Sequence, residues 1–134
     1  MIEQYWKDQA FQFLSEGEGF VKILERSLSR TSRFNNDLLF NLSVMSFEKL
    51  FVALLSYYGI EATHHAPLAL YREAQAVDSS LTDNMKQTAR LIASHESICS
   101  LDDKGYSTPT DDELGKIIIG LIEIRDYVSK KVKV

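Results

Sequence analysis

Apolar residues recur along most of this chain at intervals of three, four or seven positions, the spacing that places side chains on one face of an α-helix. No stretch shows the sustained alternation of apolar and polar residues that is typical of a half-buried β-strand. The pattern therefore predicts an all-α protein. We expect an antiparallel bundle of about five helices, with two long N-terminal helices, a short third helix and two further helices.

The first predicted helix covers about residues 3–30. Two glycines, Gly17 and Gly19, fall inside it, where each costs about 1 kcal/mol relative to alanine. Glycines at such positions indicate either a kink or a close crossing with another helix. The expected apolar stripe consists of Ile2, Trp6, Ala10, Phe13, Phe20, Leu24 and Leu28.

A second helix is predicted from about Asp37 to Tyr58. It is apolar on nearly all sides, so we expect it to be the central element of the bundle. The polar turn before it offers Asn36 as a suitable N-cap residue. Gly59 follows it and suits the left-handed conformation that ends many helices.

The apolar run over residues 38–60 is long enough to raise the question of a membrane span. Glu48 and Lys49 interrupt it, and a charged side chain at the centre of a bilayer costs roughly 2.5 kcal/mol or more. We therefore expect a helix buried by its neighbours, with no membrane as a partner.

Two further helices are predicted in the middle of the chain. Pro67 suits the first position of a short helix over residues 67–77, because that position leaves its N–H unpaired in any case. A fourth helix is predicted to begin near Ser80 or Thr82. Its apolar side consists of Leu81, Met85, Ala89, Ile92 and Cys99.

A fifth helix follows the loop SLDDKGYSTP. Thr110 and Glu113 have the spacing of a capping box, in which each side chain bonds to the backbone N–H of the other residue. Asp102 and Asp103 in the preceding loop are expected to be turn residues rather than ligands of a cation. The buried stripe of the fifth helix is predicted to be Leu114, Ile117, Ile118, Leu121, Ile124, Val128 and Val132.

Composition narrows the class of protein without naming a function. The 134 residues fit a single domain, 1–134. The net charge of −4 argues against a broad, non-specific grip on nucleic acid. Cys99 is the only cysteine, which excludes a disulfide within the chain and makes a reducing cytoplasm the expected location. The N-terminal stretch MIEQYWKDQAFQF lacks the apolar segment of a signal peptide.

The segment MSFEKLFVALLSYYGIEATHHAPLALYREA, residues 45–74, combines Glu-Lys-Leu, an apolar run ending in Gly-Ile, and a histidine followed by spaced leucines. It resembles the second and third helices of the HEPN family, the "higher eukaryotes and prokaryotes nucleotide-binding" domains. The resemblance implies a five-helix fold. It also implies one of three activities: a metal-independent ribonuclease of a toxin–antitoxin system, a partner of a minimal nucleotidyltransferase, or a non-catalytic binding module.

The resemblance also draws attention to RLIASH, residues 90–95, because the ribonuclease branch carries an arginine, four to six residues, then a histidine. It implies catalytic roles for Arg90 and His95. The histidine would transfer a proton and the arginine would stabilise phosphate charge. In an unbroken helix these two side chains point about 140° apart. A shared site therefore needs a helix break or a second subunit, and the alternative is two surface residues of an ordinary helix.

Other candidate residues have simpler interpretations. His64 and His65 are expected to cap and pack beside the third helix rather than to bind metal. Tyr57 and Tyr58 are expected to be core residues rather than a platform for stacking bases. A basic stripe at the end of the first helix, suited to a phosphate backbone, consists of Arg26, Arg30 and Arg33.

These observations predict a HEPN-like protein that forms a homodimer and binds nucleotide, RNA or a nucleotidyltransferase-type protein. One alternative is an RNA endonuclease that uses Arg90 and His95. Another is a protein-interaction module without chemistry. No metal or cofactor is expected.

Overall fold

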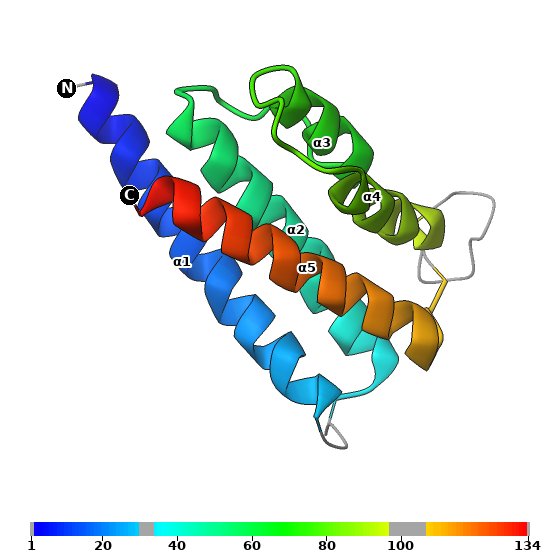
Figure 1. The fold of residues 1–134 in the computed structure, drawn as a ribbon. Helices are drawn as coiled ribbons and strands as arrows, with labels where there is room; N and C mark the ends of the chain where they lie inside the picture. The colour runs from blue at the N-terminus through cyan, green and yellow to red at the C-terminus, as the bar shows by residue number, and fades with distance from the viewer. Residues whose placement is uncertain (1, 30–33, 97–106, 134) are drawn as a thin grey trace.

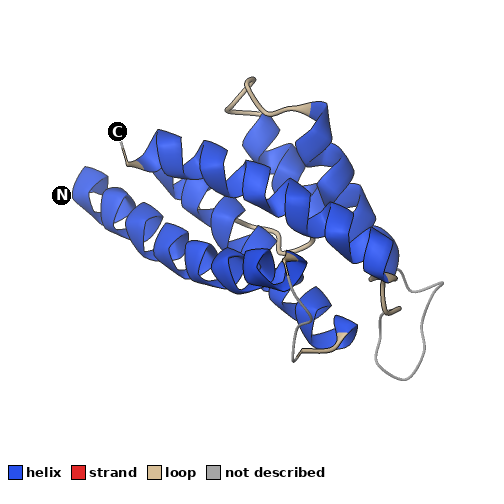
Figure 2. Cartoon of the chain, turned by 60° about the horizontal axis from the view of Figure 1, so that its bottom comes forward, coloured by secondary structure: helices blue, strands red, loops and turns tan. Residues whose placement is uncertain are grey.

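The computed structural model describes residues 2–29, 34–96 and 107–133 (Figure 1). These residues form helices and connecting segments, with no strand among them (Figure 2). The prediction of an all-α protein with two long N-terminal helices packed together is therefore confirmed. The helices are α1 (Ile2–Leu28), α2 (Asn36–Tyr57), α3 (Pro67–Gln75), α4 (Asp83–His95) and α5 (Asp111–Val132).

Helix α2 is central, because it packs against each of the other four helices. Helices α1 and α5 cover one side of it, and α3 and α4 cover the other (Figure 1). Helix α1 runs antiparallel to α2, and α4 runs antiparallel to α5 (Figure 1). Helices α2 and α5 run parallel, since both begin at the same end of the bundle. The antiparallel arrangement that we predicted is therefore wrong for α2 and α5. The segment containing α3 and α4 carries the chain back to the end of the bundle where α2 begins, so α5 starts there as well (Figure 1).

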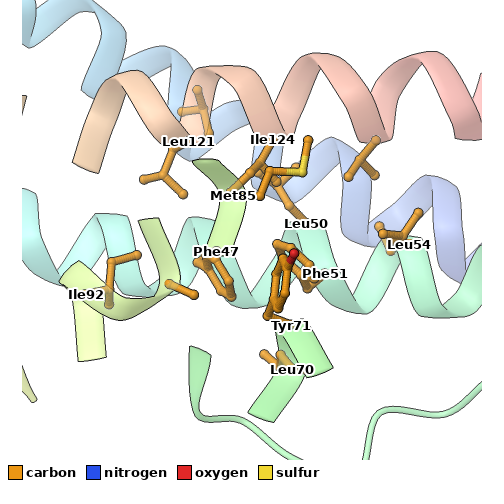
Figure 3. Close-up of a cluster of buried hydrophobic side chains, with 14 of the residues drawn as sticks. Phe47, Leu50, Phe51, Leu54, Leu70, Tyr71, Met85, Ile92, Leu121 and Ile124 are labelled. Atoms are coloured by element: carbon orange, nitrogen blue, oxygen red, sulfur yellow. The ribbon is translucent and has the colours of Figure 1, made fainter. Parts of the chain in front are cut away.

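The core of the bundle is built around the aromatic rings of α2 (Figure 3). Phe47 and Phe51 are fully buried and stack with their ring centroids 4.4 Å apart. A buried side chain of this size contributes roughly 1.5–3 kcal/mol. The other helices supply the surrounding buried side chains Leu70 and Tyr71 (α3), Met85 and Ile92 (α4), and Leu121 and Ile124 (α5).

Helix α2 contains the apolar run that raised the question of a membrane span. Among the described residues it is the single helix that is long and apolar enough to cross a membrane. Of its most apolar window, 56% is buried inside the bundle. A core helix of a globular protein passes the same test of length and hydropathy, so this property of α2 favours neither environment strongly.

The buried stripe of α1 differs from the predicted one. Leu14 and Val21 lie at its centre and are almost completely buried, although neither was in the predicted set. Phe13 and Phe20 are only half-buried and Leu28 is 44% exposed, while the side chain of Ile2 lies outside the described residues. Helical periodicity within α1 does not distinguish this face from the adjacent face, which also carries apolar residues. The packing of α1 against α2 and α5 determines which of the two faces is buried.

The two glycines of α1 have different surroundings. A Cβ atom on Gly17 would lie 2.9 Å from Cδ2 of Leu50, so α1 and α2 cross closely at this position. A Cβ atom on Gly19 would meet nothing within 4 Å. The close crossing that we considered for these glycines is therefore found at Gly17 alone.

The predicted residues at the helix ends are confirmed with one exception. Pro67 opens α3, Thr82 caps α4, Gly59 adopts a φ of 76°, and Thr110 forms both bonds of the capping box with Glu113. The exception is α2, whose N-cap is Asn35 rather than Asn36: its side chain accepts a hydrogen bond from the Leu38 N–H at 2.9 Å. All seven predicted residues of the α5 stripe are buried. Cys99, Asp102 and Asp103 lie outside the described residues.

Candidate functional site

The predicted pair Arg90 and His95 lies on α4, which is continuous from Asp83 to His95. With about 100° of rotation per residue, the two side chains point about 140° apart. Arg90 is exposed, whereas His95 is 7% exposed. One chain therefore does not bring these residues to a common phosphate.

His95 is held in place by its neighbours. Its Nδ1 shares a hydrogen bond of 2.9 Å with Oγ of Ser107, and its backbone carbonyl accepts a 2.7 Å bond from the Ser107 N–H. The ring packs edge-on against Phe40 of α2, with the centroids 5.8 Å apart. The side chain therefore joins α4, α2 and the segment that leads into α5.

The second ring nitrogen of His95 faces the start of α5. Its Nε2 lies 3.4 Å from Oε2 of Glu113, and among the described residues it has no hydrogen-bond partner. The hydrogen bond from the Thr110 N–H to Glu113 lowers the pKa of the Glu113 carboxyl against the opposing effect of burial, and the nearby His95 lowers it further. The Glu113 carboxylate thus already accepts the Thr110 N–H in the capping box of α5. The arrangement resembles a structural junction more than a proton-transfer site.

Of the predicted basic stripe, the structure describes one residue. Arg26 is exposed at the end of α1, and Arg30 and Arg33 lie outside the described residues. The expected packing of His65 is wrong: its side chain is 81% exposed, and its Nδ1 lies 2.6 Å from Oε2 of Glu48.

His64 also pairs with a carboxylate, and neither histidine belongs to a metal-binding group. Nδ1 of His64 lies 2.9 Å from Oε1 of Glu73 on α3. This pair and the one at His65 fasten the connection between α2 and α3 to both helices. Within the described ranges, no group of three or more His, Cys, Asp or Glu side chains is placed to hold a metal ion.

A surface hollow lies at the end of the bundle where α1 begins and α2 and α5 end. Its volume is about 800 Å³, within the usual range for binding sites. Aromatic side chains dominate its wall, and Phe11 and Tyr57 are 50% and 45% exposed. We call this hollow the terminal groove; its lining consists of Glu3, Trp6, Lys7, Ala10, Phe11, Tyr57, Tyr58, Gly59 and Val132.

Two lysines at the terminal groove, Lys7 and Lys133, each lie near a carboxylate. Lys7 lies 3.8 Å from Glu3, one helical turn away on α1. Lys133, next to the groove residue Val132, lies 3.0 Å from Glu18. Among the described residues, these two ion pairs bring both signs of charge to the rim, which differs from the basic surface that nucleic acids need.

Tyr58 connects the groove to a buried polar cluster that we call the Asp78 cluster: Tyr58, Asp78, Tyr127 and Lys131. The carboxylate of Asp78 is 2% exposed, accepts a 2.5 Å hydrogen bond from the Tyr127 hydroxyl and a 3.0 Å bond from the Ser80 N–H, and lies 3.8 Å from Nζ of Lys131. These contacts tie the connection after α3 to the last turns of α2 and α5.

Ionisation in the Asp78 cluster favours the charged pair. Burial raises the pKa of Asp78, but hydrogen bonds from Tyr127, Ser80 and Tyr58 outweigh this effect, so its pKa lies below the ordinary value. The hydrogen bond with Tyr58 raises the pKa of Lys131 above its ordinary value, against the effect of burial. Burial and the charge of Asp78 raise the pKa of both tyrosines. At neutral pH the lysine is a cation and both tyrosines are neutral, so none of the three is poised as a nucleophile or base.

Sequence reasoning missed the terminal groove because it assigned Tyr57 and Tyr58 to the core. Tyr57 is instead exposed and Tyr58 half-buried. The available signal was position: both tyrosines fall at the end of α2, just before Gly59, where a helix leaves the core. A smaller hollow of about 280 Å³ lies between α4 and α5, lined in part by Thr88, Leu91 and Gly120. His95 lines neither hollow.

No family model matches the chain, and the comparisons with curated proteins and with solved structures found no match either. The class that the structure defines is therefore an all-α bundle of five described helices.

Proposed function

We propose that this protein is a HEPN-like helical bundle that acts by binding a protein partner and has no catalytic chemistry of its own. The observation that carries the proposal is the terminal groove, which combines exposed aromatic rings with a rim of paired charges. Exposed apolar patches bounded by polar residues are typical of protein–protein contact sites. Tyrosine, tryptophan and phenylalanine are enriched at the centre of such interfaces.

The same groove is a weaker match for RNA or a nucleotide. Binding to a phosphate backbone depends on basic groups that release counterions. Lys7 and Lys133 already pair with Glu3 and Glu18, and Lys131 belongs to the Asp78 cluster. A polyanion would have to displace these carboxylates. Of the ligands that the resemblance to HEPN domains implies, a nucleotidyltransferase-type protein therefore suits the groove better than RNA.

The catalytic alternative has less support from the geometry. A ribonuclease site would need Arg90 and His95 to face one phosphate, and α4 holds them about 140° apart in a single chain. The His95 ring is buried and bonded to Ser107. Binding through the terminal groove requires neither residue.

Site-specific photo-crosslinking tests the proposal directly. Benzoylphenylalanine replaces Phe11 in the groove or, as a matched control, Ile119 on α5, which is 63% exposed and does not line the groove. Irradiation in the native host is expected to give a defined adduct from position 11 that position 119 does not give. The captured protein is then purified and must bind the wild type and fail to bind Phe11→Asp. Equal labelling at both positions would contradict the proposal.

The nucleic-acid and catalytic alternatives are tested on the same protein. Trp6 is the only tryptophan and lines the groove, so its fluorescence reports occupancy. Single-stranded RNA and nucleotides are expected to leave the emission unchanged; saturable, salt-dependent quenching that Tyr57→Ala removes would favour RNA instead. Expression of the wild type and of His95→Ala is expected to give equal growth and no RNA cleavage. Cleavage by the wild type alone would restore the endonuclease alternative.

A further inference from the structure

We infer that the terminal groove takes an arginine side chain of the protein partner, with the guanidinium group over an aromatic ring and beside the Glu3 carboxylate. The inference rests on the proposed protein-binding function and names the chemistry by which the groove recognises its partner. It follows from the aromatic rings of the groove and from the charges at its rim.

One face of α1 brings a carboxylate and two aromatic rings to the groove. Glu3, Trp6 and Phe11 all line it, at spacings that place side chains on one side of a helix. Helix α2 contributes Tyr57, its last residue, which is 45% exposed. A Cβ atom added to Gly59 would lie 3.8 Å from Cδ1 of Trp6, so the indole ring lies against the end of α2. Rings from two helices therefore border the same space.

The rings of the groove differ in whether a cation already lies over them. Nζ of Lys131 lies 5.9 Å from the centroid of the Tyr58 ring. In the part of the chain that the structure describes, no lysine or arginine lies over the ring of Trp6, Phe11 or Tyr57. A cation within about 6 Å of such a ring centroid is attracted to its face, and tryptophan is the strongest partner. Three rings are thus available to a cation from another molecule.

The Glu3 carboxylate is available to the same cation. Its side chain is 84% exposed, and Nζ of Lys7 lies 3.8 Å away, beyond the distance of a hydrogen bond. A carboxylate can accept several hydrogen bonds, including a bidentate pair from one arginine. By contrast, Nζ of Lys133 donates to both carboxylate oxygens of Glu18, at 3.3 and 3.0 Å. An added cation therefore finds an acceptor at the rim without having to break a hydrogen bond of Glu3 to Lys7.

The rings decide between a cationic and an anionic occupant. Lys7 is 62% exposed, so an anion also has one partner at the rim. The faces of aromatic rings carry the negative part of the ring quadrupole, so they attract a cation and disfavour an anion. The net charge of −4 adds a longer-range attraction for a basic segment. Rings and net charge therefore favour the same sign of occupant.

Among cationic side chains, arginine fits this combination better than lysine. Its planar guanidinium group stacks on a ring, forks onto a carboxylate and is more weakly hydrated than an ammonium group. Arginine and aromatic residues are also frequent among the side chains that supply most of the affinity of an interface. The groove volume of about 800 Å³ suits an occupant of drug-like size, so the residues that flank the arginine lie in it as well.

Titration with a short peptide tests the recognition of arginine, because Trp6 is the only tryptophan of the chain and lines the groove. Acetyl-Gly-Arg-Ala-Arg-Gly-amide is expected to change the Trp6 emission saturably, with a Kd of about 0.1–1 mM. The same peptide with citrulline, which has the shape of arginine without its charge, is expected to bind at least about 10-fold more weakly. The lysine peptide should bind about 3-fold more weakly, and the glutamate peptide should leave the emission unchanged.

Two pairs of variants separate the carboxylate from the ring. Glu3→Gln is expected to weaken binding of the arginine peptide about 5-fold, whereas Glu123→Gln, at an exposed position of α5 outside the groove, should leave it unchanged. Tyr57→Leu keeps an apolar side chain without the ring and is expected to weaken binding about 5-fold. Tyr57→Phe keeps the ring and should bind as the wild type does. Circular dichroism establishes that each variant is folded.

The captured partner supplies the second test. Mass spectrometry of the adduct from position 11 identifies the partner segment that lies in the groove, and this segment is expected to contain arginine. Replacing that arginine with glutamine in the purified partner is expected to weaken binding to the wild type about 100-fold. Replacement with lysine should weaken it about 10-fold.

Four results would overturn the inference: an arginine peptide that leaves the Trp6 emission unchanged, arginine and citrulline peptides that bind equally, an affinity that neither Glu3→Gln nor Tyr57→Leu changes, or a crosslinked segment without arginine. A specific adduct from position 11 together with any of these results leaves the proposed function in place, with a different chemistry of recognition. The absence of a specific adduct contradicts the proposed function instead. The peptide titrations then still decide whether the groove recognises arginine.

Discussion

Where α2 and α5 begin, polar side chains join the helices to one another, whereas where the same two helices end, aromatic rings stand beside an open groove. At the first end, the Asn36 side chain donates to the Pro109 carbonyl at 3.2 Å and to Asp111 at 2.8 Å. The Thr108 hydroxyl donates to the Asp37 carboxylate, and His95 bonds to Ser107. At the second end, Phe11 and Tyr57 remain about half exposed.

The two ends therefore differ in how completely their side chains are engaged within the bundle. Polar groups at the first end connect segments, and the His95 ring there is bonded to Ser107 and packed against Phe40. Apolar area at the second end is left uncovered although its removal from water would be favourable by about 25 cal/mol per Å². Tyr58 belongs both to the groove lining and to the Asp78 cluster, whose contacts join the ends of α2 and α5.

The largest expected effect comes from breaking the Asp78 cluster. Asp78→Asn is expected to lower the free energy of unfolding by about 3 kcal/mol, because Lys131 then faces no carboxylate in a largely buried site. Urea unfolding followed by circular dichroism measures the change. The matched control is Asp126→Asn, whose carboxylate is 67% exposed beside Arg125 and should change stability by about 0.5 kcal/mol or less.

The pH dependence of this effect has a defined sign. The pKa of Asp78 is lowered in the folded protein, so its stabilisation is present above the unfolded value of about 4 and is lost as the pH falls through the folded pKa. The difference between wild type and Asp78→Asn is therefore expected to shrink below about pH 4. A difference that grows with acidity would show that the carboxylate does not carry it.

An intermediate effect is expected at the opposite end. His95→Ala is expected to lower the free energy of unfolding by about 2 kcal/mol, since it removes a buried ring and the bond to Ser107. Arg90→Ala, on the exposed side of the same helix, should change it by about 0.5 kcal/mol or less. Chemical denaturation of the two proteins compares them; equal losses would contradict a structural role specific to His95.

The smallest effect is expected along α1, which connects the packed part of the bundle to the groove. Gly17→Ala is expected to cost about 1 kcal/mol, because the new Cβ atom meets Leu50. Gly19→Ala adds a Cβ in open space and is expected to stabilise by about 0.5 kcal/mol through helix propensity. Thermal unfolding of both variants should move in opposite directions. A stabilised Gly17→Ala would mean that α1 and α2 do not cross closely there.

Much of the fold was predictable because its signals are local. The capping box of Thr110 and Glu113, the proline at the start of α3 and the left-handed Gly59 each depend on residues within one turn of one another. The stripe of α5 was also correct, since this helix has a single apolar face. The stripe of α1 was not, because two adjacent faces carry apolar residues and contact with α2 and α5 selects one of them.

The candidate sites were less predictable for a related reason. A spacing such as that of Arg90 and His95 gives an angle on a helix but no information about what packs against either residue. Burial of His95 depends on Phe40 and Ser107, which lie far away or beyond a loop in sequence. The terminal groove depends on where three helices stop relative to one another, a quantity that no short segment contains.

The sequence by itself determined the helical class, the approximate bounds of the helices and most of their caps, since these follow from backbone hydrogen bonding and the period of apolar residues. Only the tertiary structure decided that α2 and α5 run parallel, that His95 is enclosed, and that Trp6, Phe11, Tyr57 and Tyr58 share one open groove. The physical reason is that apolar burial has no preferred direction. The partner of each apolar face is therefore set by the whole bundle and not by the residues of that face alone.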